Sequence, residues 1–180
     1  KDEAYELTEN RSYFAIMMVE TGEADAMVSG VSHEYDEVMG PALRLIGPKP
    51  GLDRISSMYI VFTKKGPYSF ADTTVNLDPD WKTLAENALM TAEMVRRFNI
   101  EPVIAMLSYS NFGSIKPGEH TLGPAKVRQA TEYLHKNYPD MLVDGEIQAN
   151  FALNREMCKS KFPFSKIANH DVNVLIFPNL

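Results

Sequence analysis

Four short stretches of this chain place small or polar side chains directly after an apolar run. They are residues 29–32 (SGVS), 108–114 (SYSNFGS), 144–150 (DGEIQAN) and 177–180 (FPNL). Hydroxyls, amides and free backbone N–H groups are the donors that a phosphate or a carbonyl oxygen needs. Little in these stretches could act as a strong general base, so they favour a binding site for an oxygen-rich ligand.

Each stretch also has a plainer interpretation. Ser29-Gly30 is compatible with a simple tight turn, because serine and glycine are common in such turns. Asp144-Gly145-Glu146 is compatible with a turn carrying solvated carboxylates, or with a carboxylate pair for acid–base work. The three serines, the asparagine and the glycine of 108–114 are more than a turn requires.

The sequence offers no other strong catalytic or metal-binding pattern. The four histidines lack metal-ligand spacing, and Cys158 has no histidine beside it in the sequence. No glycine-rich GxGxxG or GxxxxGK[ST] motif is present. We therefore expect neither a metal site nor a nucleophilic cysteine in this chain.

Composition narrows the class of protein. The chain has 180 residues, of which 44% are apolar and 23% charged, as in a globular domain. The net charge is −6 and the basic residues are scattered, which argues against nucleic acid as a partner. There is no apolar run near 18 residues and no leader pattern, so we expect no membrane partner. With a single cysteine, a cytoplasmic location is expected.

The elements that must position the four stretches alternate between helix and strand. In the first 46 residues we expect a loop or frayed end at 1–9 and a helix at 10–21 that ends at Gly22. We then expect a buried strand at 24–30 and a helix at 33–46 that is capped by Ser32. The segment GPKPG at 47–51 breaks any regular element and marks a domain boundary.

After this boundary the pattern predicts a hairpin and then strands separated by helices. The expected segments are strands at 55–62 and 68–75, a helix opened by Asp78-Pro79, a strand at 102–108, a helix at 124–138, a strand from 141 that leads into a helix start, and a strand at 171–178. The alternation indicates an α/β fold with a mostly parallel sheet. Because the chain ends on a strand with no covering helix, we interpret it as a fragment.

Four motifs in this order resemble the phosphate acetyl/butyryltransferase family: YFAIMMVETGEADAMVSGVS, IAMLSYSNFGS, DGEIQAN and VNVLIFPNL. The resemblance implies a two-lobed α/β/α sandwich of the isocitrate/isopropylmalate dehydrogenase type, with an acyl-CoA and phosphate cleft between the lobes. Residues 1–46 would end the first lobe, and 52–180 would form a second lobe that is incomplete at its C-terminus. It further implies a homodimer or higher homo-oligomer.

The resemblance also implies which residues contact acyl-CoA. These are Ser29, Gly30, Ser32, Ser108, Ser110, Asn111, Gly113, Ser114, Asp144, Glu146, Gln148 and Asn179. Active members transfer an acetyl group between CoA and phosphate, and this chain departs from their pattern. Gly40 stands before Pro41 where the family has an arginine, Asn150 stands where aspartate is usual, and the serine-arginine catalytic motif would lie beyond Leu180.

The segments PKPG and DGEIQANFALN are similar to the form of this domain fused to the C-terminus of bacterial NADP-dependent malic enzymes. This similarity favours a non-catalytic domain that binds acetyl-CoA as a regulatory effector, covalently linked to an upstream oxidoreductase domain with NADP and Mg²⁺ or Mn²⁺. One alternative is a fragment of an active phosphate acetyltransferase that uses Arg44 or Arg54 in place of the missing arginine. Another is a purely structural dimerisation domain.

Overall fold

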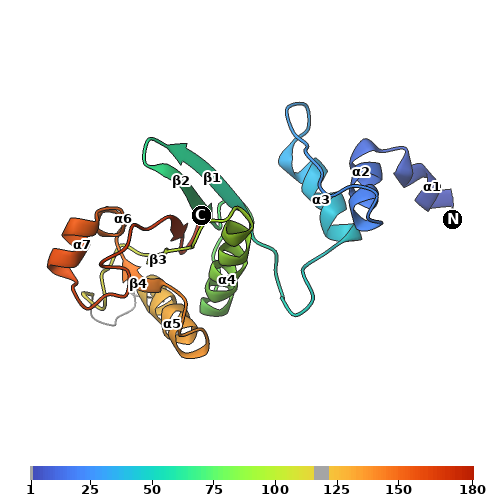
Figure 1. Cartoon of the computed structure of the whole chain (residues 1–180). Coiled ribbons are helices and arrows are strands. Elements are labelled where there is room, and N and C mark those ends of the chain that lie inside the picture. The colour runs from blue at the N-terminus through green and yellow to red at the C-terminus, as the bar shows by residue number, and fades with distance from the viewer. Residues whose placement is uncertain (1, 116–121) are drawn as a thin grey trace. The chain divides into compact units, whose positions relative to one another are not determined.

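The chain consists of two compact units. The computed structural model describes residues 2–115 and 122–180, and the units are Lys1–Ile55 and Ser56–Leu180 (Figure 1). The division falls four residues after the predicted boundary at 47–51. The assignment of the two units to lobes of a larger enzyme stays a prediction.

The first unit is helical. It contains α1 (Asp2–Thr8), α2 (Arg11–Glu20) and α3 (Tyr35–Leu45). The predicted α2 is confirmed: the Asn10 side chain accepts hydrogen bonds from the amides of Ser12 and Tyr13, and Gly22 follows the helix with φ +79°. The expectation of a loop at 1–9 is wrong, because α1 occupies most of this segment.

Two further expectations for the first unit are wrong. Residues 24–30 form no strand and are largely exposed, with Val28 99% exposed. A strand needs a neighbouring strand to take up its backbone hydrogen bonds, and the described part of this unit contains none. Helix α3 is capped by Glu34 instead of Ser32, and the Glu37 carboxylate accepts the Glu34 amide at 3.0 Å.

The second unit contains one five-stranded sheet. Its strands are β1 (Met58–Thr63), β2 (Gly66–Ala71), β3 (Ile104–Leu107), β4 (Val143–Ile147) and β5 (Val174–Ile176). Their order in space is β1-β2-β5-β3-β4, with β1 and β2 antiparallel and the remaining pairs parallel. The predicted α/β fold with a mostly parallel sheet and a leading hairpin is therefore confirmed.

Hydrophobic side chains of the central strands point alternately to two separate cores. Ile104 and Met106 of β3 belong to one core, whereas Ala105 and Leu107 belong to the other. The first core also contains residues of α4 (Trp81–Arg97) and α5 (Leu122–Asn137), and the second contains residues of α6 (Ala149–Ala152) and α7 (Arg155–Lys161). Strands buried on both faces explain the unbroken apolar run at 102–108.

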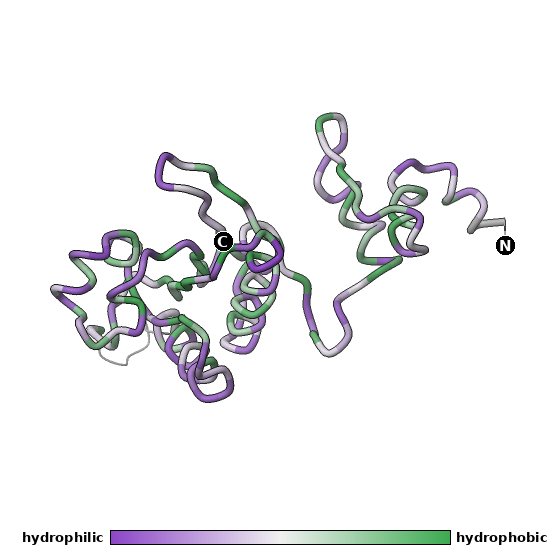
Figure 2. Tube along the Cα trace, viewed as in Figure 1, coloured by the Kyte–Doolittle hydropathy of each residue, from purple (hydrophilic) through white to green (hydrophobic). Residues whose placement is uncertain are grey.

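The helices of this unit follow the predicted pattern, except that the cap of α4 is shifted and α7 is an additional helix. Hydrophilic and hydrophobic residues alternate along α4 and α5 (Figure 2), as expected for helices with one buried face. Asp80 caps α4 by accepting the Thr83 amide at 2.8 Å, so the predicted cap at Asp78 is wrong by two residues. Helix α7 was not predicted.

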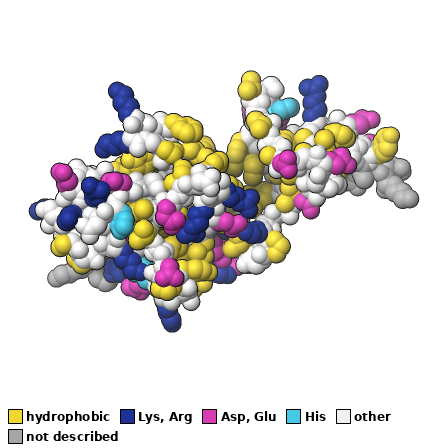
Figure 3. All heavy atoms as spheres, viewed as in Figure 1, with side chains coloured by type: hydrophobic (Ala, Val, Ile, Leu, Met, Phe, Trp, Pro, Cys, Tyr) yellow, Lys and Arg dark blue, Asp and Glu magenta, His cyan; other side chains and the backbone are white. Residues whose placement is uncertain are grey.

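Charged side chains of both signs are interspersed on the face of the second unit drawn in Figure 3. None of the described helices combines the length and the apolar character required to cross a bilayer.

The buried carboxylate of Asp72 organises the backbone that follows β2. Asp72 is 2% exposed, and it accepts hydrogen bonds from the amides of Ser57, Thr74, Val75 and Asn76 at 2.9–3.2 Å. Burial by itself would raise the pKa of this carboxyl, but the hydrogen bonds from Ser57, Thr74 and Asn76 lower the pKa below its usual value. The ionised form therefore stabilises the folded state.

Replacing Asp72 with asparagine should lower the free energy of unfolding at pH 7 by about 3 kcal/mol. The asparagine NH2 group would replace one acceptor oxygen and would then face backbone N–H donors. The folded pKa is depressed, so the stabilisation is present above the unfolded pKa of about 4 and disappears as the pH falls through the folded value. Urea unfolding at several pH values should show the difference from wild type shrinking below about pH 4. Asp171→Asn, at an exposed ion pair with Arg155, is the control and should change little.

Substitution of a second buried polar side chain should raise stability instead of lowering it. Asn87 of α4 is 0% exposed, and neither its amide nitrogen nor its amide oxygen finds a hydrogen-bond partner among the described residues. Asn87→Leu should raise the free energy of unfolding by about 1–2 kcal/mol, because an unsatisfied buried amide is removed. Thermal denaturation checks this prediction. Thr91→Val is the contrast and should not be stabilising, since the Thr91 hydroxyl already donates to the backbone carbonyl of Asn87 at 2.7 Å. A lower melting temperature for Asn87→Leu would contradict the prediction.

Candidate functional site

The loop after β3 and the end of β4 form one hydrogen-bonded cluster at the carboxyl edge of the sheet. The Ser108 amide donates to the Ile147 carbonyl at 3.0 Å, and the Phe112 amide donates to the Glu146 carbonyl at 2.8 Å. This cluster brings together seven of the predicted site residues: Ser108, Ser110, Asn111, Gly113, Ser114, Glu146 and Gln148. In parallel sheets such edges are where ligands bind.

Glu146 lies at the centre of the cluster and is 0% exposed. Its Oε1 accepts hydrogen bonds from the Ser110 hydroxyl at 3.0 Å, the Gly113 amide at 2.8 Å and Nη2 of Arg128 at 3.0 Å. Its Oε2 accepts Nε of Arg128 at 3.1 Å. Burial opposes ionisation, but the hydrogen bonds from Arg128, Gly113 and Ser110 lower the pKa of Glu146 below its usual value.

Arg128, on α5, was missed at the level of sequence. Its side chain is 36% exposed, although its partner Glu146 is fully buried. The hydrogen bond with Glu146 raises the pKa of the guanidinium, which keeps Arg128 charged. The two residues lie 18 positions apart on different elements, and no motif or spacing connects them. Only the packing of α5 beside β4 reveals the pair.

The backbone amides of the loop are occupied within the cluster. Ser110 N–H donates to the Ser108 hydroxyl, Asn111 N–H to the Ser114 hydroxyl, and Ser114 N–H to the Asn111 carbonyl. The amides of Phe112 and Gly113 donate to Glu146. The expectation that this loop offers free N–H donors is therefore wrong for residues 110–114.

Side chains also hold the loop in place. The amides of Asn111 and Gln148 form a reciprocal pair: Asn111 Nδ2 donates to Gln148 Oε1 at 2.7 Å, and the Gln148 backbone N–H donates to Asn111 Oδ1 at 2.8 Å. Phe112, at φ +44°, places its ring 5.0 Å from that of Phe162 and 5.1 Å from that of Phe164. These contacts anchor the loop from its apolar side.

Asp144 belongs to a different network. Its Oδ2 accepts the Ser165 hydroxyl at 2.7 Å and the Lys166 amide at 2.8 Å, and Nε2 of His135 lies 3.7 Å from Oδ1. Asp144 is therefore tied to the segment after α7, while Glu146 is tied to the loop after β3. The two carboxylates do not form the shared acid–base pair considered from the sequence.

The end of β5 contributes the remaining predicted residue of the second unit. The Phe177 amide donates to the Ala71 carbonyl at 2.7 Å, and the Leu180 amide donates to the Leu77 carbonyl at 3.1 Å. Asn179 lies between them and is exposed. Among the described residues, no group of three or more histidine, cysteine or carboxylate side chains is arranged to hold a metal ion.

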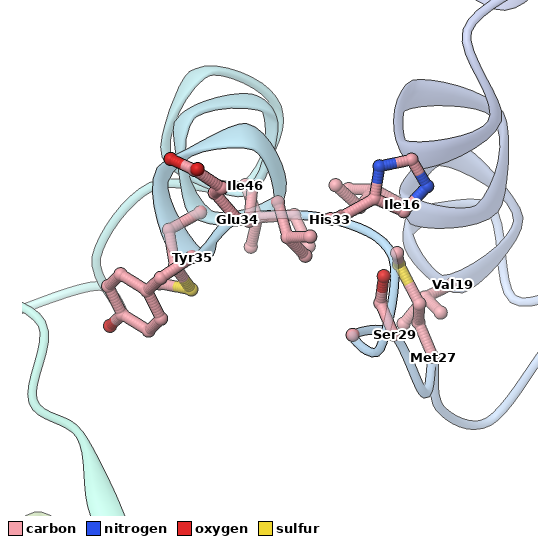
Figure 4. A pocket seen from close by; sticks show the side chains of 12 residues that line it. Ile16, Val19, Met27, Ser29, His33, Glu34, Tyr35 and Ile46 are labelled. Carbon is pink, nitrogen blue, oxygen red and sulfur yellow. The ribbon is translucent and has the colours of Figure 1, made fainter.

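Two of the three predicted residues of the first unit, Ser29 and Gly30, lie at a cavity of about 580 Å³ (Figure 4). Ser29 and Gly30 line it together with apolar side chains that include Ile16, Val19 and Met27. Ser32 is exposed, and its amide donates to the Gly30 carbonyl at 2.8 Å. That Ser29 and Gly30 face the loop 108–114 across a cleft stays a prediction.

Comparison with known proteins identifies the family. The family described as phosphate acetyl/butaryl transferase matches residues 1–180. A phosphate acetyltransferase of Staphylococcus epidermidis is 35% identical over 181 residues, covering 100% of this chain and 55% of the relative. A phosphate acetyltransferase of Bacillus subtilis is 37% identical, covering 95% of this chain and 51% of the relative.

Solved structures agree with the sequence matches. A phosphotransacetylase from Streptococcus pyogenes has a TM-score of 0.86 and 39% identity, over 99% of this chain and 54% of the other. A branched-chain phosphotransacylase from Enterococcus faecalis, with a TM-score of 0.71 and 18% identity over 93% of this chain and 58% of the other, shares the fold. The chain thus spans about half the length of the relatives it matches.

These matches correct the functional prediction made from the sequence. The assignment to a non-catalytic, acetyl-CoA-sensing domain of a malic enzyme is wrong, because the chain matches phosphate acetyltransferases over almost its whole length. The prediction of an upstream domain that binds NADP and a divalent metal ion rested on that assignment alone. The broader resemblance is confirmed: the chain belongs to the phosphate acetyl/butyryl transferase family.

Proposed function

We propose that the protein to which this chain belongs is a phosphate acetyltransferase, which moves an acetyl group between CoA and phosphate. The observation that carries this proposal is the joint match in sequence and fold, at 35% identity to a phosphate acetyltransferase over the whole chain and a TM-score of 0.86 to a phosphotransacetylase. Acetyl-CoA or a related acyl-CoA, and phosphate, are the proposed substrates. The homo-oligomer and the cytoplasmic location stay predictions.

The reaction sets clear requirements for the site. When the CoA thiolate attacks the carbonyl of acetyl phosphate, negative charge develops on the carbonyl oxygen and the phosphate must be held in place. Arginines and other hydrogen-bond donors supply both needs. Arg128, beside the clustered loop ends of the second unit, is a group of this chain that fits the requirement.

Gly40 remains the main departure from the family pattern. It lies exposed in α3, and a Cβ built at Gly40 would meet no atom within 4 Å. Arg44 lies one helical turn further on, so it shares a face of α3 with Gly40. Its Nη1 donates to the Tyr13 hydroxyl at 3.1 Å. Position 40 itself therefore carries no charged donor of the kind that the family pattern places there.

The first experiment is an activity assay of the full-length protein. We expect acetyl phosphate to form from acetyl-CoA only when inorganic phosphate is present. The free CoA thiol that is released in the same reaction serves as the readout. Malate oxidation in the presence of NADP should be absent. Failure to form acetyl phosphate, with a folded protein and saturating substrates, would overturn the proposed function.

Restoring the family arginine tests the interpretation of Gly40. Gly40→Arg should raise kcat/KM for acetyl phosphate about 10²-fold, because a charged donor is added where the family holds phosphate. It should also stabilise α3 by roughly 0.5–1 kcal/mol, since glycine is a poor helix former. Gly40→Ala is the matched control: it should give the gain in stability without the gain in activity. Equal kcat/KM for the arginine and alanine variants would contradict the prediction.

A further inference from the structure

We propose that Arg128 binds a phosphoryl group of the ligand and that Glu146 is the positioning residue that holds Arg128 in place. The identity of the ligand rests on the proposed function, whereas the binding of a phosphoryl group by Arg128 rests on the geometry of the cluster. Arg128 is not among the residues implied by the family resemblance, and it belongs to a different unit from Gly40.

Two hydrogen bonds to Glu146 fix the orientation of the Arg128 guanidinium. Nε and Nη2 of Arg128 each donate to one oxygen of the Glu146 carboxylate, at 3.1 and 3.0 Å, so the planar group is held at two points. A guanidinium carries five N–H groups, and these two bonds leave three that Glu146 does not use. Because Glu146 is 0% exposed and Arg128 is 36% exposed, the accessible part of the pair is the arginine.

Gly113 lies beside the Arg128 guanidinium. Gly113 has a backbone φ of +80°, which residues with a side chain rarely adopt. A Cβ at this position would lie 3.6 Å from Nη2 and 3.7 Å from Cζ of Arg128. Even this first carbon of a side chain would be in van der Waals contact with the guanidinium. Because Gly113 has no side chain, this position does not cover the guanidinium, while its amide donates to Glu146.

Arg128 is a better source of donors for an anion than the backbone of the loop. The amides of residues 110–114 are used within the cluster, so the loop itself supplies few donors to an anion. Arg128 contributes N–H groups at this same edge of the sheet, in the planar arrangement that suits phosphate oxygens. The phosphoryl group belongs either to inorganic phosphate and acetyl phosphate or to CoA, and the experiment separates these sources.

A purely structural ion pair is the competing explanation. It predicts that substitutions at Arg128 lower stability but leave the affinity of the folded protein for phosphoryl ligands unchanged. Phosphoryl binding predicts a loss of affinity that exceeds what the change in melting temperature explains. Stability and affinity must therefore be measured on the same variants.

The test uses the full-length protein and titration calorimetry with inorganic phosphate and, separately, with CoA. Arg128→Ala should raise the Kd for one or both ligands by about 10- to 100-fold, and Arg128→Lys by about 10-fold, because lysine keeps the charge but loses the planar donor pair. Arg155→Ala is the matched control, since Arg155 pairs with Asp171 at an exposed site, and its Kd values should equal those of wild type. If Arg128→Ala does not fold, Arg128→Lys decides.

Glu146→Gln tests the positioning role. If Glu146 acts through Arg128, the effects of Glu146→Gln and Arg128→Lys on Kd should be clearly less than additive in a double-mutant cycle. Additive effects would remove Glu146 from the proposal. A larger change for phosphate assigns Arg128 to the acyl phosphate, and a larger change for CoA assigns it to the CoA phosphates.

The inference and the proposed function can fail separately. Binding of phosphate or CoA that depends on Arg128, without formation of acetyl phosphate, would overturn the function and keep the inference. Wild-type Kd values in a folded Arg128→Ala variant would overturn the inference even in an active enzyme. Failure of the wild-type protein to bind either ligand would also overturn it.

Discussion

The second unit depends on the burial of one charged group, the Glu146 carboxylate. An ionised carboxylate away from water is costly unless each oxygen finds a donor, and Glu146 accepts four hydrogen bonds. These bonds tie the loop after β3, the end of β4 and helix α5 together. The shape of the candidate site therefore follows from the need to satisfy a charge beneath it.

The same principle applies at two other carboxylates of this unit. Asp72 is surrounded by the amides of the residues that follow β2, and Asp144 accepts the Ser165 hydroxyl and the Lys166 amide. All three acidic side chains hold segments that connect strands and helices. Because their oxygens are occupied by protein donors, their geometry suits a structural or positioning role better than proton transfer.

This arrangement changes the interpretation of the site. The polar loop was expected to bind an anion through its own amides, but these amides stabilise the loop itself. The charge available at the edge of the sheet comes from a neighbouring helix, through Arg128. In the proposed reaction, which handles phosphate, the hydrogen-bonded loop would set the shape of the site and Arg128 would supply the charge that attracts the phosphoryl group.

Much of the fold and the family could be predicted from the sequence alone. The apolar runs that became β3 and β5, the periodicity of α4, the turn between β1 and β2, and the four ordered motifs are all local patterns. A strand at 24–30 was wrong because such a segment becomes a strand only when another strand pairs with it. The pairing of Arg128 with Glu146 and the separation of Asp144 from Glu146 were decided by tertiary structure. Periodicity shows which face of an element is buried, but the partner of a buried charge depends on how a helix packs against the sheet.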